Sequence, residues 1–291
     1  MIVTITCNPA IDKTIYGNKT IFNIGGKGIN VSKVLKNLEC DSLLTGFIGK
    51  ENKDEVLNEL KDFNCHFIEV DGKVRTNTKK IIDNELYEEN ENGPFISEDK
   101  LYELLEYLDS FHNEIVVISG SVSNNVNDDY YEKLVRKLKE NNNYVILDCA
   151  GKQLLNGIKA LPDVIKPNKD EICELFNIKY NEDIVIEKCK QLINEGVGMV
   201  VVSLGSEGCL FINKENVYKV NALQLNYKSS LGAGDALIAG VAYSKLHNYE
   251  EEKMIKLAIS CASAEVEMEG SLPPSSTNIK NKLNSVIIRR K

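Results

Sequence analysis

The chain has 291 residues, which is enough for one large α/β domain with a full core or for two small domains. Its 35 basic and 43 acidic residues give a net charge of −8, and without a basic block this argues against a nucleic-acid partner. No apolar run approaches the ~20 residues needed to cross a bilayer, and the first residues lack the charged region of a signal peptide, so we expect no membrane partner. The eight cysteines form no Cys-x-x-Cys pair; they indicate reduced, buried thiols in a cytoplasmic protein and neither zinc nor disulfides.

The chain opens with an alternation of β-branched residues. Residues 2–7 predict a strand that stops at Asn8 and Pro9 and runs into a loop, and Asp12 follows in that loop. In an open α/β sheet this loop would lie at the carboxyl edge, where ligands bind. Asp12 could therefore hold hydroxyl groups of a ligand, although a solvated loop aspartate explains it equally well.

A glycine cluster follows at residues 25–28. Apolar residues at 31, 34, 35 and 38 have helical spacing, so the glycines form the turn that opens a helix. Lys27 stands between glycines, where it is free to reach a phosphate, and Asn30 falls in the first helical turn. The spacing of a Walker A loop is absent, and plain turn chemistry explains such a cluster as often as a ligand site does.

The pattern then changes from crossover units to a polar hairpin. After a strand at 42–48, a helix at 54–61 and a strand at 65–70, residues 74–82 and 84–89 alternate in a way that suits a small sheet standing off the main one. Arg75 and Lys79 are four residues apart and would point the same way, so they could clamp a phosphate. A solvated charged face is the simpler interpretation.

From residue 97 onward, helices and strands alternate regularly, and this predicts a parallel, doubly wound sheet. The expected elements are helices at 97–110, 128–140, 182–194 and 251–267, a C-terminal helix from about 277, and strands at 115–119, 144–148, 164–165, 200–203 and 222–227.

Two short motifs lie between these elements. Asn168 and Glu171 have the spacing of a helix capping box, and the same pair could orient a hydrated Mg²⁺ ion. After the strand that ends at Ser203, a turn with Gly205 and Gly208 would let adenine or phosphate lie against bare backbone.

The stretch at residues 228–243 begins polar, tightens through Gly232, Ala233 and Gly234, and continues after Asp235 as an apolar run. We expect a buried helix that starts near Gly232 or Ala233. Its first N–H groups lack intrahelical partners and lie at the positive end of the helix dipole, so an anion is stabilised there. Asp235 is either a helix-capping carboxylate or a general base beside that anion site.

Taken in order, these motifs resemble those of the ribokinase-like carbohydrate kinases, within them most closely the branch that contains 1-phosphofructokinase and tagatose-6-phosphate kinase. The resemblance runs from residue 2 to about residue 270. It is carried by Asn8-Pro9-Ala10-x-Asp12, Gly25-Gly26-Lys27-Gly28-Ile29-Asn30-Val31, Arg75-x-Asn77-x-Lys79, Gly93-Pro94, Ile118-Ser119-Gly120-Ser121, Lys166-Pro167-Asn168-x-x-Glu171, Ser203-Leu204-Gly205-x-x-Gly208 and Leu231-Gly232-Ala233-Gly234-Asp235.

The resemblance implies a single domain over residues 1–291, a three-layer α/β/α fold with a doubly wound, mostly parallel sheet and a small, shortened β lid at about 13–24 and 73–90. It implies transfer of the γ-phosphoryl group of ATP, with Mg²⁺, to a ketohexose phosphate. Fructose 1-phosphate, giving fructose 1,6-bisphosphate, is the leading acceptor. The alternatives are tagatose 6-phosphate and a sugar-phosphate-binding regulator with little turnover.

The resemblance also implies roles for individual residues. Asp235 would be the base, and Gly232, Ala233 and Gly234 the anion hole. The sugar would be held by Asp12, Gly26, Asn30 and Ser121, and its phosphate by Lys27, Arg75 and Lys79. Mg-ATP would be served by Asn168 and by Glu171, which reaches the metal through water, with Lys166, Ser203, Gly205 and Gly208 near the nucleotide.

One departure from the family pattern concerns the lid. Residues 13–24 are fewer than relatives usually carry between the first aspartate and the glycine turn, and they include no arginine. One expected phosphate clamp is therefore missing, and the homodimer that such lids form becomes a weaker prediction.

Overall fold

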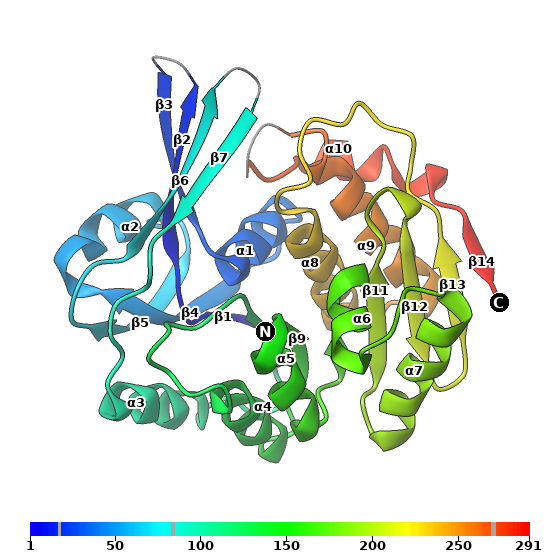
Figure 1. Ribbon diagram of the computed structural model, residues 1–291, viewed down its shortest axis with the longest axis horizontal. Coiled ribbons are helices and arrows are strands. Elements are labelled where there is room, and N and C mark those ends of the chain that lie inside the picture. Colours follow the sequence, from blue (N-terminus) through cyan, green and yellow to red (C-terminus); the bar gives the residue numbers. More distant parts are fainter. Residues whose placement is uncertain (17–18, 83–84, 269–271) are drawn as a thin grey trace.

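The protein is seen here as a computed structural model that describes residues 1–16, 19–82, 85–268 and 272–291, with residues 16, 19, 79, 81, 82, 85, 86 and 88 described for their backbone alone. Its centre is a ten-stranded sheet with the strand order β14-β13-β12-β11-β10-β9-β8-β1-β4-β5 (Figure 1). The strands of this sheet are β1 (Ile2–Thr6), β4 (Ser42–Gly49), β5 (Asn64–Val70), β8 (Ile115–Ser119), β9 (Tyr144–Asp148), β10 (Val164–Ile165), β11 (Met199–Ser203), β12 (Cys209–Asn213), β13 (Val217–Val220) and β14 (Ile288–Arg290).

The strands from β5 to β11 in this order are parallel, and β12, β13 and β14 are antiparallel to their neighbours. Every residue of β1 and β8 is buried, as expected for parallel strands covered by helices on both faces. The fold class predicted from the alternation of strands and helices, a mostly parallel sheet between two helical layers, is confirmed.

Helices cover both faces of the sheet and define two main apolar cores. One core includes residues of α3 (Glu98–Leu108), α4 (Tyr130–Glu140), α5 (Gly151–Gly157), α6 (Lys169–Phe176) and α7 (Glu182–Glu195), and the other residues of α1 (Lys27–Asn37), α8 (Ala233–Leu246), α9 (Glu251–Glu265) and α10 (Ser276–Lys280). A smaller cluster lies under α2 (Lys53–Glu59). Single 3₁₀ turns occur at Lys50–Asn52, Ile158–Ala160, Gly205–Glu207 and Leu283–Ser285.

Helix α8 is buried on nearly all sides, which explains why its sequence has no polar stripe. Every residue from Asp235 to Ala242 is buried, and Gly240 lets α9 approach so closely that a Cβ there would lie 2.6 Å from the Cα of Ala258. Because α8 is packed between other elements over most of its length, its N-terminus is held in a fixed place.

A second, four-stranded sheet has the order β3-β2-β6-β7 and stands off the main sheet (Figure 1). It consists of two antiparallel hairpins, β2 (Ala10–Tyr16) with β3 (Lys19–Gly25) and β6 (Arg75–Ile82) with β7 (Glu85–Asn90), joined by parallel pairing of β2 and β6. The hairpin predicted over 74–89 is confirmed. The loop predicted for Asp12 is wrong, because Asp12 lies on β2, opposite Asn23 on one side and Asn77 on the other.

The strand predicted at 222–227 is also wrong. Those residues form no strand; the edge of the sheet is instead made by β13 and β14, which pair with each other. The alternation of Leu223, Leu225 and Tyr227 belongs to an irregular surface segment, in which Tyr227 is 68% exposed. The predicted C-terminal helix is brief, and the chain returns to the sheet as β14.

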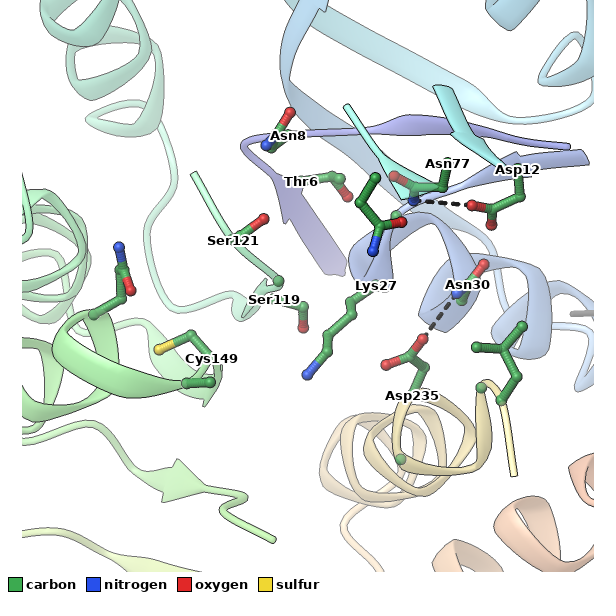
Figure 2. Close-up of a pocket in the computed structure, with 18 of the residues that line it drawn as sticks. Thr6, Asn8, Asp12, Lys27, Asn30, Asn77, Ser119, Ser121, Cys149 and Asp235 are labelled. Carbon is green, nitrogen blue, oxygen red and sulfur yellow. Dashed lines mark hydrogen bonds between the residues drawn. The ribbon is translucent and has the colours of Figure 1, made fainter. Parts of the chain in front are cut away.

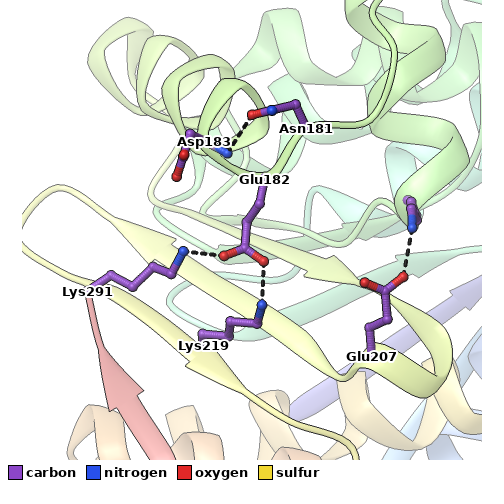
Figure 3. A network of polar contacts seen from close by, with 7 residues as sticks. Asn181, Glu182, Asp183, Glu207, Lys219 and Lys291 are labelled. Atoms are coloured by element: carbon purple, nitrogen blue, oxygen red, sulfur yellow. Dashed lines mark hydrogen bonds and ion pairs between the residues drawn. The ribbon is translucent and has the colours of Figure 1, made fainter.

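An ion-pair network fastens this edge of the sheet to α7 (Figure 3). Glu182, in the first turn of α7, pairs with Lys219 of β13 at 2.5 Å and also with Lys291, the residue after β14. Asn181 caps the same helix by accepting hydrogen bonds from the backbone N–H groups of Asp183 and Ile184.

Among the described helices, none is long and apolar enough to cross a membrane.

Candidate active site

A polar cavity lies at the carboxyl ends of β1, β8 and β9. It has a volume of about 590 Å³ and is bounded by these strand ends, by the base of the small sheet and by the start of α8. Strand β1 has β4 on one side and β8 on the other, so the cavity lies where the order of strands reverses. This is the place where open α/β sheets bind ligands.

Asp235 lies in the first turn of α8, at the wall of the cavity. The helix begins where predicted, because Gly232 takes a left-handed conformation (φ 79°) that glycine adopts without strain. The carboxyl group of Asp235 is buried, and its Oδ2 accepts a hydrogen bond of 2.8 Å from Asn30 Nδ2 (Figure 2). Burial and the nearby charge of Asp148 raise the pKa of Asp235 to about 6, against the opposing effects of Lys27, Asn30 and Lys166.

A buried carboxylate at the end of β9 binds two lysines. Asp148 Oδ1 lies 3.2 Å from Lys27 Nζ, at the start of α1, and 3.2 Å from Lys166 Nζ, just after β10. Burial alone would raise the pKa of Asp148, but these two cations outweigh it and lower that pKa. Burial alone would likewise lower the pKa of Lys27, but Asp148, Asp235 and Glu171 together raise it. Within this Lys27–Asp148–Lys166 triad, Lys27 and Asp148 are therefore charged at neutral pH.

The triad lies beside the N-terminus of α8. A Cβ on Gly234 would come within 3.0 Å of Lys166 Nζ, so the lysine reaches the backbone of the first helical turn. In Figure 2 the side chain of Lys27 extends from α1 between Ser119 and Asp235. The positive end of the helix and two ammonium groups thus face the same part of the cavity, which favours a highly charged anion there.

The small sheet supplies the opposite wall. Asp12 Oδ1 accepts a hydrogen bond of 3.0 Å from Asn77 Nδ2, its direct cross-strand neighbour. Asp12 also covers Gly25, where an added Cβ would lie 2.1 Å from the carboxylate. Arg75 Nη2 donates to the carbonyl oxygen of Asn8 at 3.4 Å. One carboxylate and one guanidinium group are therefore held at this wall.

Several buried polar atoms that line the cavity have no hydrogen-bond partner among the described residues. Such atoms are rare in folded proteins, and around a cavity they fit a ligand rich in hydroxyl groups and charge. They are Thr6 Oγ1, Asn8 Oδ1, Asn30 Oδ1, Arg75 Nε, Asn77 Oδ1 and Ser119 Oγ.

The cavity brings together most of the residues that the sequence suggested for the acceptor, the base and the anion hole, namely Asp12, Gly26, Lys27, Asn30, Arg75, Ser121, Gly232, Gly234 and Asp235. Ala233 lies in the same helical turn but does not line the cavity. The side chain of Lys79 lies outside the part of the chain that the structure describes; its backbone pairs with Thr14 and Glu88.

Of the residues suggested for the nucleotide, Lys166 lines this cavity, and the others lie outside it, around the ends of β10 and β11; these are Asn168, Glu171, Ser203, Gly205 and Gly208. The capping box predicted at α6 is confirmed: Asn168 Oδ1 accepts from the backbone N–H of Glu171 at 2.8 Å, and Glu171 Oε2 accepts from that of Asn168 at 2.7 Å. Asn168 forms a parallel bridge with Ser203, and a tight turn from Gly205 to Gly208 follows. In the described residues, no group of three or more His, Cys, Asp or Glu side chains could hold a metal ion.

Sequence reasoning missed several residues of the site. Asp148 is the most important, and its signal was a charged residue at the end of the otherwise apolar strand 144–148. Polar residues that line the cavity but were given no role are Thr6, Asn8, Asn77, Asn90, Ser119, Gln153 and Ser230.

The fold and the site together define a class of protein. The main sheet is doubly wound and has a polar cavity at its switch point. Beside the cavity lie a glycine-capped helix N-terminus with a buried carboxylate and a partial cover formed by the small sheet. This is the arrangement of an α/β/α kinase that acts on a polyhydroxylated acceptor.

Comparisons with known proteins identify the family. Residues 2–278 match the pfkB family carbohydrate kinases. The chain is 33% identical to the 1-phosphofructokinase of Borreliella burgdorferi, over 94% of this chain and 93% of the relative, and 31% identical to the tagatose-6-phosphate kinase of Staphylococcus epidermidis, over 89% of each chain. Its fold superposes on phosphofructokinase-2 from Escherichia coli with a TM-score of 0.91, at 24% identity and over 98% of both chains. The chain belongs to the pfkB family of carbohydrate kinases.

Proposed function

We propose that this kinase transfers the γ-phosphoryl group of ATP to a hydroxyl group of fructose 1-phosphate and so forms fructose 1,6-bisphosphate. The observation that carries the proposal is the buried Asp235 carboxylate at the N-terminus of α8, beside the Lys27–Asp148–Lys166 triad. The relatives named 1-phosphofructokinase, at 32–33% identity, support the choice of acceptor.

Asp235 would act as the general base. With a pKa of about 6 it is largely ionised at neutral pH, and its proton affinity lies close to the working pH, where a base is most effective. Its hydrogen bond from Asn30 leaves the second carboxylate oxygen to accept the proton of the attacking hydroxyl group. Holding base, hydroxyl and phosphorus in line removes the entropic cost of bringing them together.

The N-terminal turn of α8 would stabilise the phosphoryl group during transfer. Gly232 and Gly234 have no side chain and Ala233 has only a methyl group, so phosphate oxygens can approach the N–H groups closely. Lys166, which lies next to Gly234, would add positive charge on the nucleotide side of the cavity. Fixed donors of this kind need no reorganisation when charge moves during the reaction.

The acceptor would lie between the small sheet and α1. Asp12, Gly26, Asn30 and Ser121 would hold the sugar. The phosphate it already carries would be bound by Lys27, Arg75 and Lys79.

We further propose that the small sheet serves as a lid. Its strands form one wall of the cavity, and closure would exclude the water that otherwise consumes ATP.

The eight cysteines are all free thiols, which supports action in a reducing compartment such as the cytoplasm.

Mg-ATP would lie toward β10 and β11, near Ser203, Gly205 and Gly208. Glu171 fits a hydrated Mg²⁺ ion, because the capping box uses only its Oε2 and it is close enough to Lys27 to raise the pKa of that lysine. Asn168 would support Glu171 there. When bound, the metal would neutralise part of the charge on the ATP phosphates.

A second acceptor, tagatose 6-phosphate, is favoured by one observation: the relative from Staphylococcus epidermidis is nearly as similar as the 1-phosphofructokinases. An assay of ADP release with fructose 1-phosphate, fructose 6-phosphate, tagatose 6-phosphate and fructose separates these functions. We expect kcat/KM to be highest for fructose 1-phosphate. Preference for tagatose 6-phosphate would move the protein to the second function, and absence of ADP release with every sugar would favour a binding protein without turnover.

The variant Lys27→Ala tests the phosphate contact in the same assay. We expect the KM for fructose 1-phosphate to rise by about tenfold or more, because a charge-assisted hydrogen bond to phosphate is lost, while the KM for unphosphorylated fructose changes little. Lys50→Ala is the matched control, since Lys50 pairs with the exposed Asp71 away from the cavity. An unchanged KM in Lys27→Ala would remove this lysine from the phosphate site.

A further inference from the structure

A third buried carboxyl group lies against the cap of α8. Glu265, the last residue of α9, is 3% exposed, and its Oε2 has no hydrogen-bond partner among the described residues. Its Oε1 faces Gly232 so closely that a Cβ at that glycine would lie 2.6 Å away. Gly232 itself lines the cavity, so this carboxyl group touches the backbone of the cavity wall.

The charged groups around Glu265 come from two neighbouring helices. Burial and the charge of Asp235 on α8 raise the pKa of Glu265 to about 8, and Lys33 on α1 acts in the opposite direction. The hydrogen bond that Lys33 Nζ donates goes to the carbonyl oxygen of Ile24. Cys261, one turn earlier on α9, is buried, and its burial and Glu265 both raise the pKa of that thiol. Glu265 is therefore mostly neutral at pH 7.

The end of α9 also supports the loop that leads into α8. The backbone N–H groups of Lys228 and Ser229 both donate to the carbonyl oxygen of Val266, at 2.8 and 3.2 Å. The backbone N–H of Asn226 donates to Glu267, whose carboxylate also pairs with Lys282 at 2.5 Å. The residues that directly follow α9 thus hold the loop whose final residues form the proposed anion site.

We propose that Glu265 is a positioning residue for phosphoryl transfer. As a neutral acid it supports the glycine cap of α8, and when it loses its proton it weakens the binding of phosphate at that helix N-terminus. This proposal rests on the function proposed above, in which the first turn of α8 stabilises the transferred phosphoryl group. A carboxylate next to the cap would offset the positive end of the helix and repel the incoming anion. Burial keeps solvent from screening this effect.

The consequence is an alkaline limb in the pH profile that depends on Glu265. From the effect of one charge at a partly buried helix terminus, we expect kcat/KM for ATP to fall by about tenfold between pH 7 and pH 9 in the wild-type protein. In Glu265→Gln, the ratio of kcat/KM at pH 9 to that at pH 7 should rise about tenfold over the wild-type ratio. Glu252→Gln, at an exposed glutamate in the first turn of the same helix, is the matched control, and its profile should follow the wild type.

Stability supplies a second readout that does not depend on turnover. Because folding raises the pKa of Glu265 above its usual value near 4.5, the folded state binds more protons than the unfolded state between about pH 4.5 and 8. The wild-type protein should therefore lose stability relative to Glu265→Gln as the pH rises through this window. If Glu265→Gln fails to fold, Glu265→Met, an apolar replacement of similar size, takes its place.

The outcomes separate this proposal from the proposed function. An alkaline limb that persists in Glu265→Gln overturns the role of Glu265, even if Asp235→Asn is inactive. A wild-type alkaline limb that moves with sodium or potassium concentration also overturns it, because the carboxylate would then be paired with a cation. An active Asp235→Asn variant would instead remove the base, whatever Glu265 does.

Discussion

Replacing Asp235 with asparagine tests whether its carboxylate is the general base of the proposed phosphoryl transfer. Asparagine keeps the size of the side chain and an oxygen that can accept the hydrogen bond from Asn30 Nδ2, but it cannot take up the proton of the attacking hydroxyl group. A positioned general base contributes roughly 10²- to 10⁴-fold to turnover. We therefore expect kcat for fructose 1-phosphate to fall by about three orders of magnitude, with little change in KM.

The same substitution should stabilise the folded protein. Folding raises the pKa of Asp235 from its usual 3.8 to about 6, so the folded state binds more protons than the unfolded state between these values and loses stability as the pH rises through them. Above pH 6 this corresponds to a cost of roughly 3 kcal/mol. Asparagine does not titrate, so Asp235→Asn should be more stable than the wild type above pH 6, and the difference should vanish below about pH 4.

Two measurements check the expected loss of turnover and the expected gain in stability of Asp235→Asn. ADP release gives kcat and KM, and urea unfolding at pH 4, 6 and 8 gives the free energy of unfolding. Asp183→Asn is the matched control, because Asp183 also lies in the first turn of a helix but is exposed, and it should change neither quantity appreciably. Turnover within tenfold of the wild type, or a marked loss of stability at pH 8, would refute the assignment of Asp235 as a buried base.

Two further predictions concern the walls of the cavity. In Gly25→Ala the new Cβ would lie 2.1 Å from the carboxylate of Asp12 and displace it. The KM for the sugar phosphate should therefore rise by about tenfold, while the thermal unfolding temperature changes little. An unchanged KM would argue against contact between Asp12 and the acceptor. Asp148→Asn leaves Lys27 and Lys166 without their buried counter-ion. We therefore expect the free energy of unfolding to fall by about 3 kcal/mol and the KM values for both substrates to rise. An unchanged free energy of unfolding would contradict the role of the triad.

The features that the sequence predicted well depend on residues close together in the chain. The start of α8 follows from Gly232, Ala233 and Gly234 in succession, and the capping box of α6 follows from Asn168 and Glu171, three residues apart. Helix caps and glycine turns are determined within one or two turns of backbone, so their signals survive without knowledge of the fold.

The features that it missed depend on residues far apart in the chain. Asp148 is recognisable as an ionic centre only when Lys27, 121 residues earlier, is brought beside it. Asp12 was placed in a loop because its partner in the small sheet, Asn77, is 65 residues away. The opposite error occurred at 222–227, where alternation indicated one apolar face but no neighbouring strand was there to pair with it.

Three buried carboxyl groups near the start of α8 differ because their surroundings differ. Asp148 binds two lysines, and its pKa is lowered, so it stays charged throughout the physiological range. At Asp235, burial and the negative charge of Asp148 outweigh these cations and raise the pKa to about 6. Glu265 Oε2 has no hydrogen-bond partner among the described residues, and burial raises the pKa of Glu265 to about 8. Surroundings that separate the pKa values of neighbouring acids separate their roles as well. In the proposed mechanism, the counter-ion is charged between about pH 6 and 8, the base is ready to accept a proton and the acid under the glycine cap is neutral. On that proposal, this is the state of the three groups in which α8 would both activate a hydroxyl group and bind a phosphate.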